Sequence, residues 1–461
     1  MRSSSRTHGC GQSVVSAAVL GVYSVLMRLA QPLLRRKIAR RALQEPGYGE
    51  ATAERFGTYT QAPEPASQLV WLHAVSLGET RAAGVLLEHL RALYPGLRVL
   101  LTHGTATGRA AGKALLRQGD VQVWQPWDTR AVVEEFFTHF KPRLALLLET
   151  EVWPAWVAAA NQRRIPMVLV NGRLSEKSLQ QALRWSPLAV PAYAGLTAVW
   201  AQTALDAERF RQLDVTTVSV LGNLKFDAAP SISQQAAGQA WRGELRQRVV
   251  MLASSREGEE ALFIEQIKAA GQQIRAQAAP ENIANNPLNI TKWLIVPRHP
   301  QRFDEVAALV LRSGLKLSRR SSWLGSPFHD TDAMLADVWL GDSLGEMPLY
   351  YALSSVALLG GSFEKLGGQN LIEAAACGCP VMMGPHTFNF SEAAEQSEAA
   401  GAAQRFPSMA GAVKAALDLV SNSPAQQRMS QAALAFAASH QGAAGRTALA
   451  LGPYLNAPSA L

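Results

Sequence analysis

Short apolar runs alternate with helical patterns along most of this chain. The run at residues 68–73 precedes a helical pattern over about 78–94, and the run at 98–102 precedes another over 105–118. Further apolar runs of this first series stand at residues 121–124, 144–148, 167–171 and 198–202. Repeated strand and helix patterns of this kind are typical of a parallel, doubly wound α/β sheet.

A second series of the same kind fills the other half of the chain. Its apolar runs stand at residues 249–253, 293–297, 315–318, 338–340, 356–359 and 381–383. We therefore predict two Rossmann-like domains, at residues 46–222 and 246–461. A Ser-, Gln- and Ala-rich linker at 223–245 joins them, and an N-terminal extension covers residues 1–45.

The extension carries an uncharged apolar segment over residues 14–27, followed by a cationic cluster over 35–41. A transmembrane helix needs about 20 apolar residues, so the pattern favours an anchor helix that lies in the membrane or barely spans it. A cationic flank favours the cytoplasmic side, so we expect the residues that follow the segment to lie in the cytoplasm.

Charge supports the same interpretation. The formal net charge is +8, yet residues 1–45 hold eight of the 44 Lys and Arg residues and only one of the 36 Asp and Glu residues. The globular part is nearly neutral, which argues against a nucleic-acid partner. A charged fraction of 17% is low against the usual quarter or so, which agrees with contact to lipid.

The sequence lacks the motifs of several common classes of enzyme and metal site. No G-x-G-x-x-G follows the first expected strand and no G-x-x-x-x-G-K-[ST] occurs, so dehydrogenases and P-loop enzymes are disfavoured. The three cysteines, Cys10, Cys377 and Cys379, lack the spacing of a zinc site. No D-x-D turn follows a strand, so we predict neither a metal ion nor a cofactor.

Candidate chemistry lies where strands end, because ligands of open α/β sheets bind at the carboxyl ends of strands. Glu79 follows the first strand in a small-residue turn that opens a helix. It is a candidate general base, although a first-turn Glu also suits the helix dipole. Glu149 and Glu151 follow the strand at 144–148, where one could contact substrate while the other caps a helix or forms an ion pair.

The second half offers a candidate phosphate site. Arg298 is held between prolines after one expected strand, and Glu346 follows another. The stretch 367–377 begins with Gly367 and Gly368 and continues as an expected helix over 371–377. Its N-terminal amides suit an anion, and Glu373 suits a ribose hydroxyl.

The chain contains, in this order, the strings WLHAVSLGE, ETEVWP, NGRLSEKS, GNLKFD, EGEE, PRHPQRF, GDSLGEM and GGQNLIEAAACGCPVMMGPHTFNF. Taken together, these strings resemble the 3-deoxy-D-manno-octulosonic acid (Kdo) transferases of lipopolysaccharide synthesis, a GT-B glycosyltransferase family. The resemblance implies two Rossmann-like domains with a cleft between them. It also implies inverting transfer of Kdo from the co-substrate CMP-Kdo to a lipid A precursor, lipid IVA.

The resemblance also assigns roles to single residues. Glu79 matches the family's general base, and Glu149 and Lys225 match positions that stabilise the transition state. Residues of the second half match the CMP-binding segments: Pro297, Arg298, Leu344, Gly345, Glu346, Asn370, Leu371, Ile372 and Glu373. The chain departs from the family pattern with Gln369 in place of His, Leu371 in place of Pro, Gly172 in place of Ala and Leu344 in place of Met.

Two alternatives differ in what they predict. Another GT-B nucleotide-sugar transferase or an epimerase would use a different donor, since the fold does not fix the substrate. A non-catalytic scaffold at the membrane surface would tolerate Glu79→Gln, whereas the enzyme would lose its rate and keep its affinity for CMP.

Overall fold

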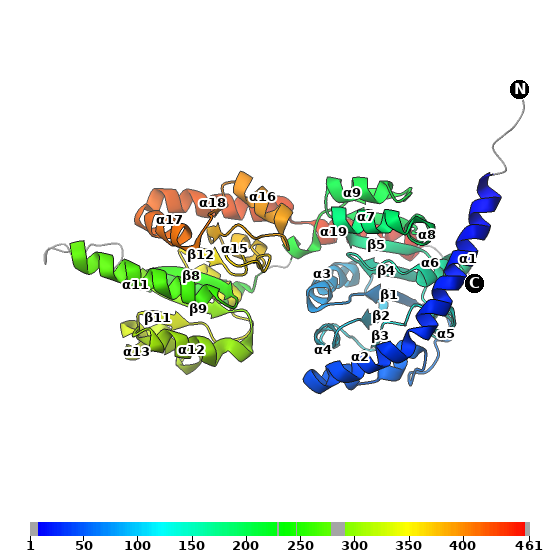
Figure 1. The fold of residues 1–461 in the computed structure, drawn as a ribbon, viewed down its shortest axis with the longest axis horizontal. Coiled ribbons are helices and arrows are strands. Elements are labelled where there is room, and N and C mark those ends of the chain that lie inside the picture. Colours follow the sequence, from blue (N-terminus) through cyan, green and yellow to red (C-terminus); the bar gives the residue numbers. More distant parts are fainter. Residues whose placement is uncertain (1–7, 228–229, 246, 278–290, 457–461) are drawn as a thin grey trace, which may run out of the picture. The chain divides into compact units, whose positions relative to one another are not determined.

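The computed structural model describes residues 8–227, 230–245, 247–277 and 291–456. The chain divides into two compact units. The first comprises residues 1–228 together with 441–461, and the second comprises residues 229–440. Each unit is built on one parallel sheet (Figure 1).

The sheet of the first unit has the strand order β3-β2-β1-β4-β5-β6-β7, and all its neighbours are parallel. Its strands are β1 (Leu69–His73), β2 (Arg98–His103), β3 (Val121–Trp124), β4 (Leu144–Leu148), β5 (Met167–Gly172), β6 (Ala198–Ala201) and β7 (Val218–Val220). The sequence-based prediction located six of these strands. It missed β7, a three-residue strand whose last two residues are exposed.

The sheet of the second unit has the order β10-β11-β9-β8-β12-β13-β14 and is also parallel throughout. Its strands are β8 (Arg248–Ser255), β9 (Thr291–Pro297), β10 (Leu317–Arg319), β11 (Val338–Leu340), β12 (Val356–Leu359), β13 (Val381–Met383) and β14 (Ala403–Arg405). Only the short edge strand β14 was not predicted. In both sheets the order reverses beside the first strand of the unit, which is the doubly wound topology.

Helices cover both faces of each sheet. Those of the first unit are α3 (Leu77–Leu93), α4 (Ala106–Lys113), α5 (Arg130–Phe140), α6 (Pro154–Gln162), α7 (Glu176–Arg184), α8 (Ser186–Ala194), α9 (Ala204–Arg211), α19 (Ala443–Ala450) and α20 (Gly452–Asn456). Those of the second are α10 (Ile232–Glu244), α11 (Glu259–Gln277), α12 (Phe303–Arg312), α13 (Thr331–Leu335), α14 (Met347–Leu353), α15 (Ile372–Ala376), α16 (Ser391–Ala399), α17 (Met409–Ser421) and α18 (Ser423–His440).

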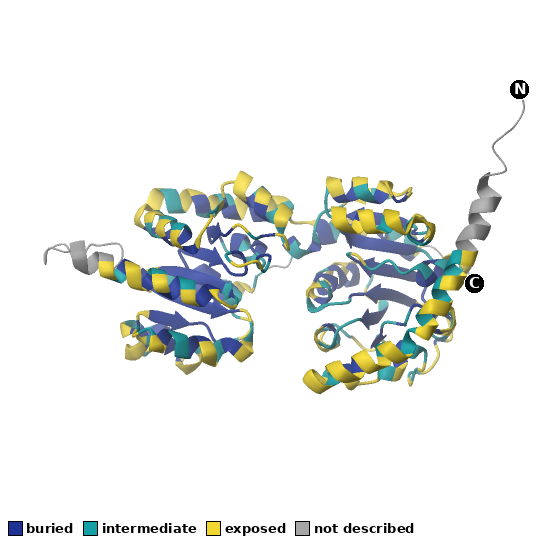
Figure 2. Cartoon of the chain, viewed as in Figure 1, coloured by how far each residue is buried: buried dark blue, intermediate teal, exposed yellow. Residues whose placement is uncertain are grey.

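Central strands are apolar on both faces because both faces are covered. In β1, Leu69 and Trp71 pack with α5 and α6 on one side, while Val70 and Leu72 pack with α3 and α19 on the other. Figure 2 shows the strands of both sheets buried beneath helices whose outer faces are exposed. This burial explains why uninterrupted apolar runs marked the strands.

The predicted domain boundary at the C-terminal end is wrong. We expected residues 441–461 in the second domain, but this segment belongs to the first unit. Ala443, Ala444 and Ala448 of α19 pack in the core formed with α3, and the Asp227 carboxylate accepts hydrogen bonds from the amides of Gly442 and Ala444. Small side chains let α19 lie close to α3, a tertiary contact that has no local sequence signal.

The predicted linker at 223–245 also differs from the structure. A 3₁₀ helix, η3 (Leu224–Asp227), belongs to the first unit, and α10 packs on α14 within the second. Gly238 permits this packing, because a Cβ atom there would lie 2.4 Å from the carbonyl oxygen of Leu349.

The N-terminal extension forms α1 (His8–Leu29) and α2 (Gln31–Gln44), followed by η1 (Pro46–Gly49) and η2 (Thr52–Phe56). Within the described residues, no helix is both long and apolar enough to span a bilayer. Leu20 packs against the core of the first unit, the Tyr23 hydroxyl donates to Asp128 (2.8 Å), and the Trp127 indole donates to the carbonyl of Met27 (3.0 Å). One face of α1 is thereby docked on the first unit.

Candidate active site

Glu79 lies in the first turn of α3, directly after β1. Its two carboxylate oxygens accept hydrogen bonds from the amide of Val75 and the hydroxyl of Ser76, each at 2.8 Å, while Ser76 caps the helix. Burial and the neighbouring charge of Glu149 raise the pKa of Glu79 to about 7, despite these hydrogen bonds. A carboxylate with such a pKa is suited to accept a proton near neutral pH.

Glu149 follows β4 in the left-handed backbone region, with φ of 59°. Such a conformation is costly for a residue with a side chain and occurs often at functional sites. The amide of Glu149 donates to the carbonyl of Val170, and its own carbonyl accepts from the amide of Arg173. These bonds to the β5 strand and the turn after it hold the strained residue in place.

Lys225 extends from η3 toward Glu149. Its Nζ lies 2.8 Å from Glu149 Oε1, and the two side chains are 27% and 13% exposed. Because Glu149 also raises the pKa of Glu79, the three side chains share one site at the carboxyl ends of β1 and β4. The structure thus brings together all three residues predicted to be catalytic.

Asn171, at the end of β5, organises this site and was not among the predicted site residues. It is buried and also adopts a positive φ, of 55°. Its Oδ1 accepts from the amide of Leu224 at 3.0 Å, and its Nδ2 donates to Glu149 at 3.5 Å. Asn171 therefore ties the segment that carries Lys225 to Glu149, and the string NGRLSEKS contained the only sequence signal for it.

The contacts of α6 show whether Glu149 or Glu151 caps this helix. Neither acid caps this helix, because the buried carboxylate of Asp128 accepts from the amides of Ala155 and Trp156. Glu151 instead accepts from the Trp153 indole at 2.8 Å, and burial raises its pKa. Sequence reasoning missed Asp128, which lies in a turn that carries no motif.

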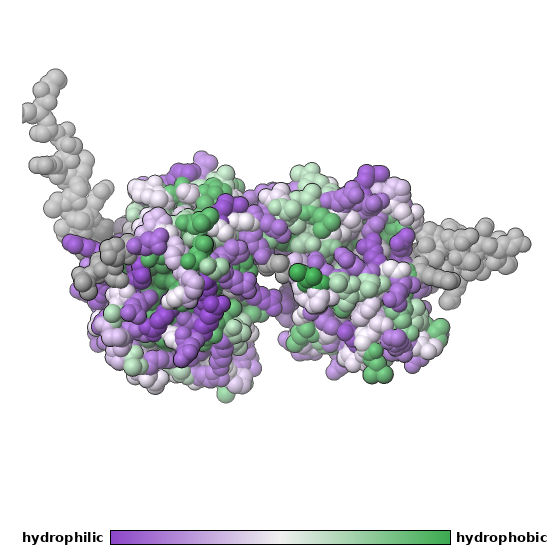
Figure 3. All heavy atoms as spheres, turned by 180° about the vertical axis from the view of Figure 1, so that it is seen from behind, coloured by the Kyte–Doolittle hydropathy of each residue, from purple (hydrophilic) through white to green (hydrophobic). Residues whose placement is uncertain are grey.

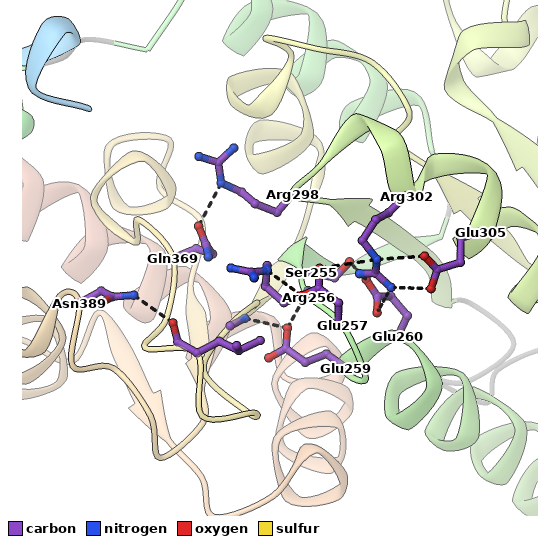
Figure 4. Close-up of polar contacts among 12 residues, drawn as sticks. Ser255, Arg256, Glu257, Glu259, Glu260, Arg298, Arg302, Glu305, Gln369 and Asn389 are labelled. Carbon is purple, nitrogen blue, oxygen red and sulfur yellow. Dashed lines mark hydrogen bonds and ion pairs between the residues drawn. The ribbon is translucent and has the colours of Figure 1, made fainter. Parts of the chain in front are cut away.

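In the second unit, Pro297 ends β9 and Arg298 follows it. The Arg298 amide donates to the carbonyl of Ser255 at 3.0 Å, and its Nε donates to Gln369 Oε1 at 3.1 Å (Figure 4). Gln369, one of the departures from the family pattern, thus makes a polar contact with Arg298, the residue predicted to bind the phosphate.

Leu344, Gly345 and Glu346 form the turn between β11 and α14. Leu344 is 75% exposed, and Gly345 has φ of 78°, which requires glycine in practice. Glu346 pairs with Arg320 at 2.9 Å, and the carbonyl of Gly345 accepts from Gln234 at the same distance. The turn is therefore fixed from two sides while its apolar tip stays accessible.

The segment Asn370 to Glu373 differs in one respect from its prediction. The helix α15 begins at Ile372 and has only five residues, and the Asn370 side chain already accepts from the Ile372 amide at 3.0 Å. The helix is therefore shorter than the expected 371–377, and the Ile372 amide of the expected anion site is already bonded within the chain. Leu371 and Ile372 are 1% and 3% exposed, so only their backbone is available to a ligand, while Glu373 is partly exposed.

The predicted donor-side residues lie at the carboxyl ends of neighbouring strands, because β9 pairs with both β11 and β8, and β8 pairs with β12. Glu259 and Glu260, which belong to the string EGEE, are buried at the start of α11, directly after β8. In the described part of the chain, no three His, Cys, Asp or Glu side chains gather as a metal-ligand group.

Two doubly wound α/β units in one chain are the fold of the GT-B glycosyltransferases. A solved UDP-GlcNAc 2-epimerase from Neisseria meningitidis, bound to UDP-GlcNAc, has this fold, with a TM-score of 0.55 over 83% of this chain and 99% of that one. At 15% identity, this likeness concerns the fold alone.

Sequence comparison identifies the family. A family model described as 3-deoxy-D-manno-octulosonic-acid transferase matches residues 50–228. The chain is 46% identical to the 3-deoxy-D-manno-octulosonic acid transferase of Bordetella pertussis, over 94% of this chain and 99% of the relative. It is 29% identical to that of Haemophilus influenzae, over 94% and 98%. The chain belongs to the Kdo transferase family and is a glycosyltransferase.

Proposed function

We propose that this protein transfers Kdo from CMP-Kdo to a hydroxyl group of a lipid A precursor in lipopolysaccharide synthesis, with inversion at the anomeric carbon and without a metal ion. The observation that carries the proposal is the carboxylate of Glu79, buried beside Glu149 with a pKa of about 7. Such a carboxylate can take the proton of an attacking hydroxyl group. The substrate class in this proposal comes from membership in the Kdo transferase family.

In the proposed reaction, Glu79 takes the proton of the acceptor hydroxyl as its oxygen attacks the anomeric carbon of Kdo. The bond between that carbon and the phosphate oxygen of CMP breaks, and CMP leaves with the bonding electrons. The hydrogen bonds from Val75 and Ser76 hold the carboxylate in one orientation, which lowers the entropic cost of reaching the transition state.

Lys225 and Glu149 stabilise opposite charges in this scheme. Positive charge develops on the sugar ring and negative charge on the departing phosphate, and preorganised charged groups stabilise such changes. Their ion pair at 2.8 Å keeps both groups in place before the substrates bind.

The second unit binds the nucleotide in this proposal. Arg298 contacts the phosphate, the exposed turn at Leu344 and Gly345 contacts the cytosine, and Asn370 and Glu373 contact the ribose. These roles agree with the exposure of Leu344 and Glu373 and with the burial of Leu371 and Ile372, which contribute only backbone groups.

A membrane surface supplies the acceptor in this proposal. On α1 the face away from the first unit carries Val22, Val25, Leu26 and Leu29, which are 58–70% exposed. The cations of α2 follow directly: Arg35, Arg36, Lys37, Arg40 and Arg41. Exposed apolar side chains beside a cationic cluster favour binding to an anionic bilayer, and we assign the protein to the cytoplasmic face of the inner membrane.

Mass spectrometry of the reaction products tests the proposal. The full-length protein is incubated with CMP-Kdo and a tetra-acylated lipid A precursor, with EDTA present throughout, and Glu79→Gln is run in parallel. We expect the mass of the acceptor to increase by one or more Kdo residues with the wild type only. Loss of product in EDTA would contradict the metal-independent step, and equal product from Glu79→Gln would contradict the assigned base.

A further inference from the structure

Two arginines of the second unit stand side by side at the ends of neighbouring strands. In the parallel pairing of β8 and β9, Ser255 lies opposite Pro297, and the amide of Arg298 donates to the carbonyl of Ser255. The residues that follow, Arg256 and Arg298, are therefore adjacent. Figure 4 shows their side chains extending from the two strand ends toward the loop that carries Gln369.

The backbone that carries Arg256 is held by two buried acids. The Glu259 carboxylate accepts from the amides of Arg256 (2.9 Å), Gly361 (2.7 Å) and Phe363 (3.0 Å). Glu260 accepts from the Ser255 hydroxyl at 2.7 Å and pairs with Arg302 at 2.6 Å. The contacts of Glu259 join the turn after β8 to the turn after β12, and those of Glu260 join Ser255 to Arg302 (Figure 4). The backbone of Arg256 is therefore held from both sides.

The charge of Arg256 is only weakly compensated. Its Nε pairs with Glu257, whose side chain is 54% exposed, and such a solvated pair contributes little. The neighbouring Arg298 donates through Nε to Gln369. Burial lowers the pKa of His299, and the charges of Arg256 and Arg298 lower it further. Two adjacent cations favour a ligand that carries more than one negative charge.

The proposed donor carries two such charges on one carbon atom. Kdo is an acid, and in CMP-Kdo the anomeric carbon bears both the carboxylate and the phosphate oxygen. We infer that Arg256 binds the carboxylate of the donor sugar while Arg298 binds the phosphate. This inference rests on the proposed function, and it extends the donor site beyond the nucleotide to a group that distinguishes ulosonic acids from ordinary sugars.

Equilibrium binding in the absence of acceptor tests the inference with the full-length protein. We compare CMP-Kdo with the methyl ester of CMP, which keeps a phosphodiester charge and lacks the carboxylate. For Arg256→Gln we expect the affinity for CMP-Kdo to fall at least tenfold and the affinity for the methyl ester to change less than twofold. Arg298→Gln should lower the affinity for both ligands. Arg428→Gln, which removes an exposed arginine on α18, should leave both affinities unchanged.

Other outcomes overturn the inference. An equal loss for both ligands in Arg256→Gln would make Arg256 a phosphate ligand or a structural residue, and an unchanged affinity for CMP-Kdo would remove it from the site. Arg256→Lys keeps the charge and should retain more of the discrimination between the two ligands, which serves as the second variant if the Gln variant does not fold. Failure of the wild type to bind CMP-Kdo would instead contradict the proposed function.

Discussion

Lys225 Nζ and Glu149 Oε1 lie 2.8 Å apart at the carboxyl end of the first sheet. The residues come from separate parts of the sequence, and Asn171 holds both segments together. A partly buried ion pair of this kind is costly to break from one side, because the remaining charge loses its partner.

Loss of the Lys225 charge should slow the reaction. Lys225→Gln should lower kcat by about 100-fold or more, because removing one preorganised charged group typically costs two to three orders of magnitude. KM for the donor should change less, since the charge acts mainly in the transition state. Steady-state kinetics measure both values. Lys113→Gln, an exposed lysine of the same unit, is the matched control and should leave kcat unchanged.

The pH dependence of the reaction should report on Glu79. Its pKa is raised to about 7, so the fraction of free enzyme with an ionised base falls tenfold for each pH unit below that value. We expect kcat/KM to rise with pH up to about 7 and then to level off on this limb. A profile that stays flat between pH 5 and 7 would show that a different group controls proton transfer.

The raised pKa of Glu79 should also make the stability of the fold depend on pH, but stability should fall with rising pH where kcat/KM rises. Its pKa is 4.5 in the unfolded chain and about 7 in the folded one, so the folded state binds more protons between these values. Stability therefore falls as pH rises through this window, by at most about 3 kcal/mol for a shift of this size. Urea unfolding should show Glu79→Gln more favourable relative to the wild type at pH 8 than at pH 4.5.

The hydrogen bond from Tyr23 to Asp128 should stabilise the docked position of α1. Tyr23→Phe removes the donor, and a hydrogen bond to a charged group contributes about 1.5 to 3 kcal/mol. Asp128→Asn combined with Tyr23→Phe forms a double-mutant cycle in urea unfolding. A coupling energy near zero would mean that the contact contributes nothing to the docking of α1.

Membrane binding should depend on the outer face of α1. Leu26→Asp with Leu29→Asp places two charges where 60–70% exposed side chains would meet the bilayer, so we expect co-sedimentation with anionic vesicles to fall severalfold. The matched control is Leu205→Asp with Leu449→Asp, two exposed leucines elsewhere in the first unit. Equal loss in both variants would argue against α1 as the contact surface.

These surface positions are among many apolar residues that remain accessible. On the face seen in Figure 3, apolar residues are interspersed with polar and charged ones over both units. The feature that sets α1 apart is therefore the cationic helix that follows it rather than its exposed apolar side chains alone.

Sequence patterns predicted the central strands of each sheet and the turns after them that carry the candidate site residues. Central strands such as β4 are buried on both faces, so their apolar runs are unbroken, and the residues after them lie at the carboxyl edge of the sheet. The proximity of Lys225 to Glu149 could come only from the family resemblance, since spacing does not show which distant turns meet. Asn171 and Asp128 act through hydrogen bonds of one side chain each. Such bonds leave no pattern of hydrophobic and polar positions in the sequence.

The return of residues 441–461 to the first unit affects the order in which the two units can finish folding during synthesis. Nascent domains generally fold as they leave the ribosome, and here the second unit is a continuous stretch, residues 229–440. The first unit lacks α19 until residues 443–450 have been synthesised, so the surface of α3 that α19 covers stays exposed until then. The second unit is therefore complete before the first, and a chain that stops near residue 440 carries a first unit without the helix that packs on α3.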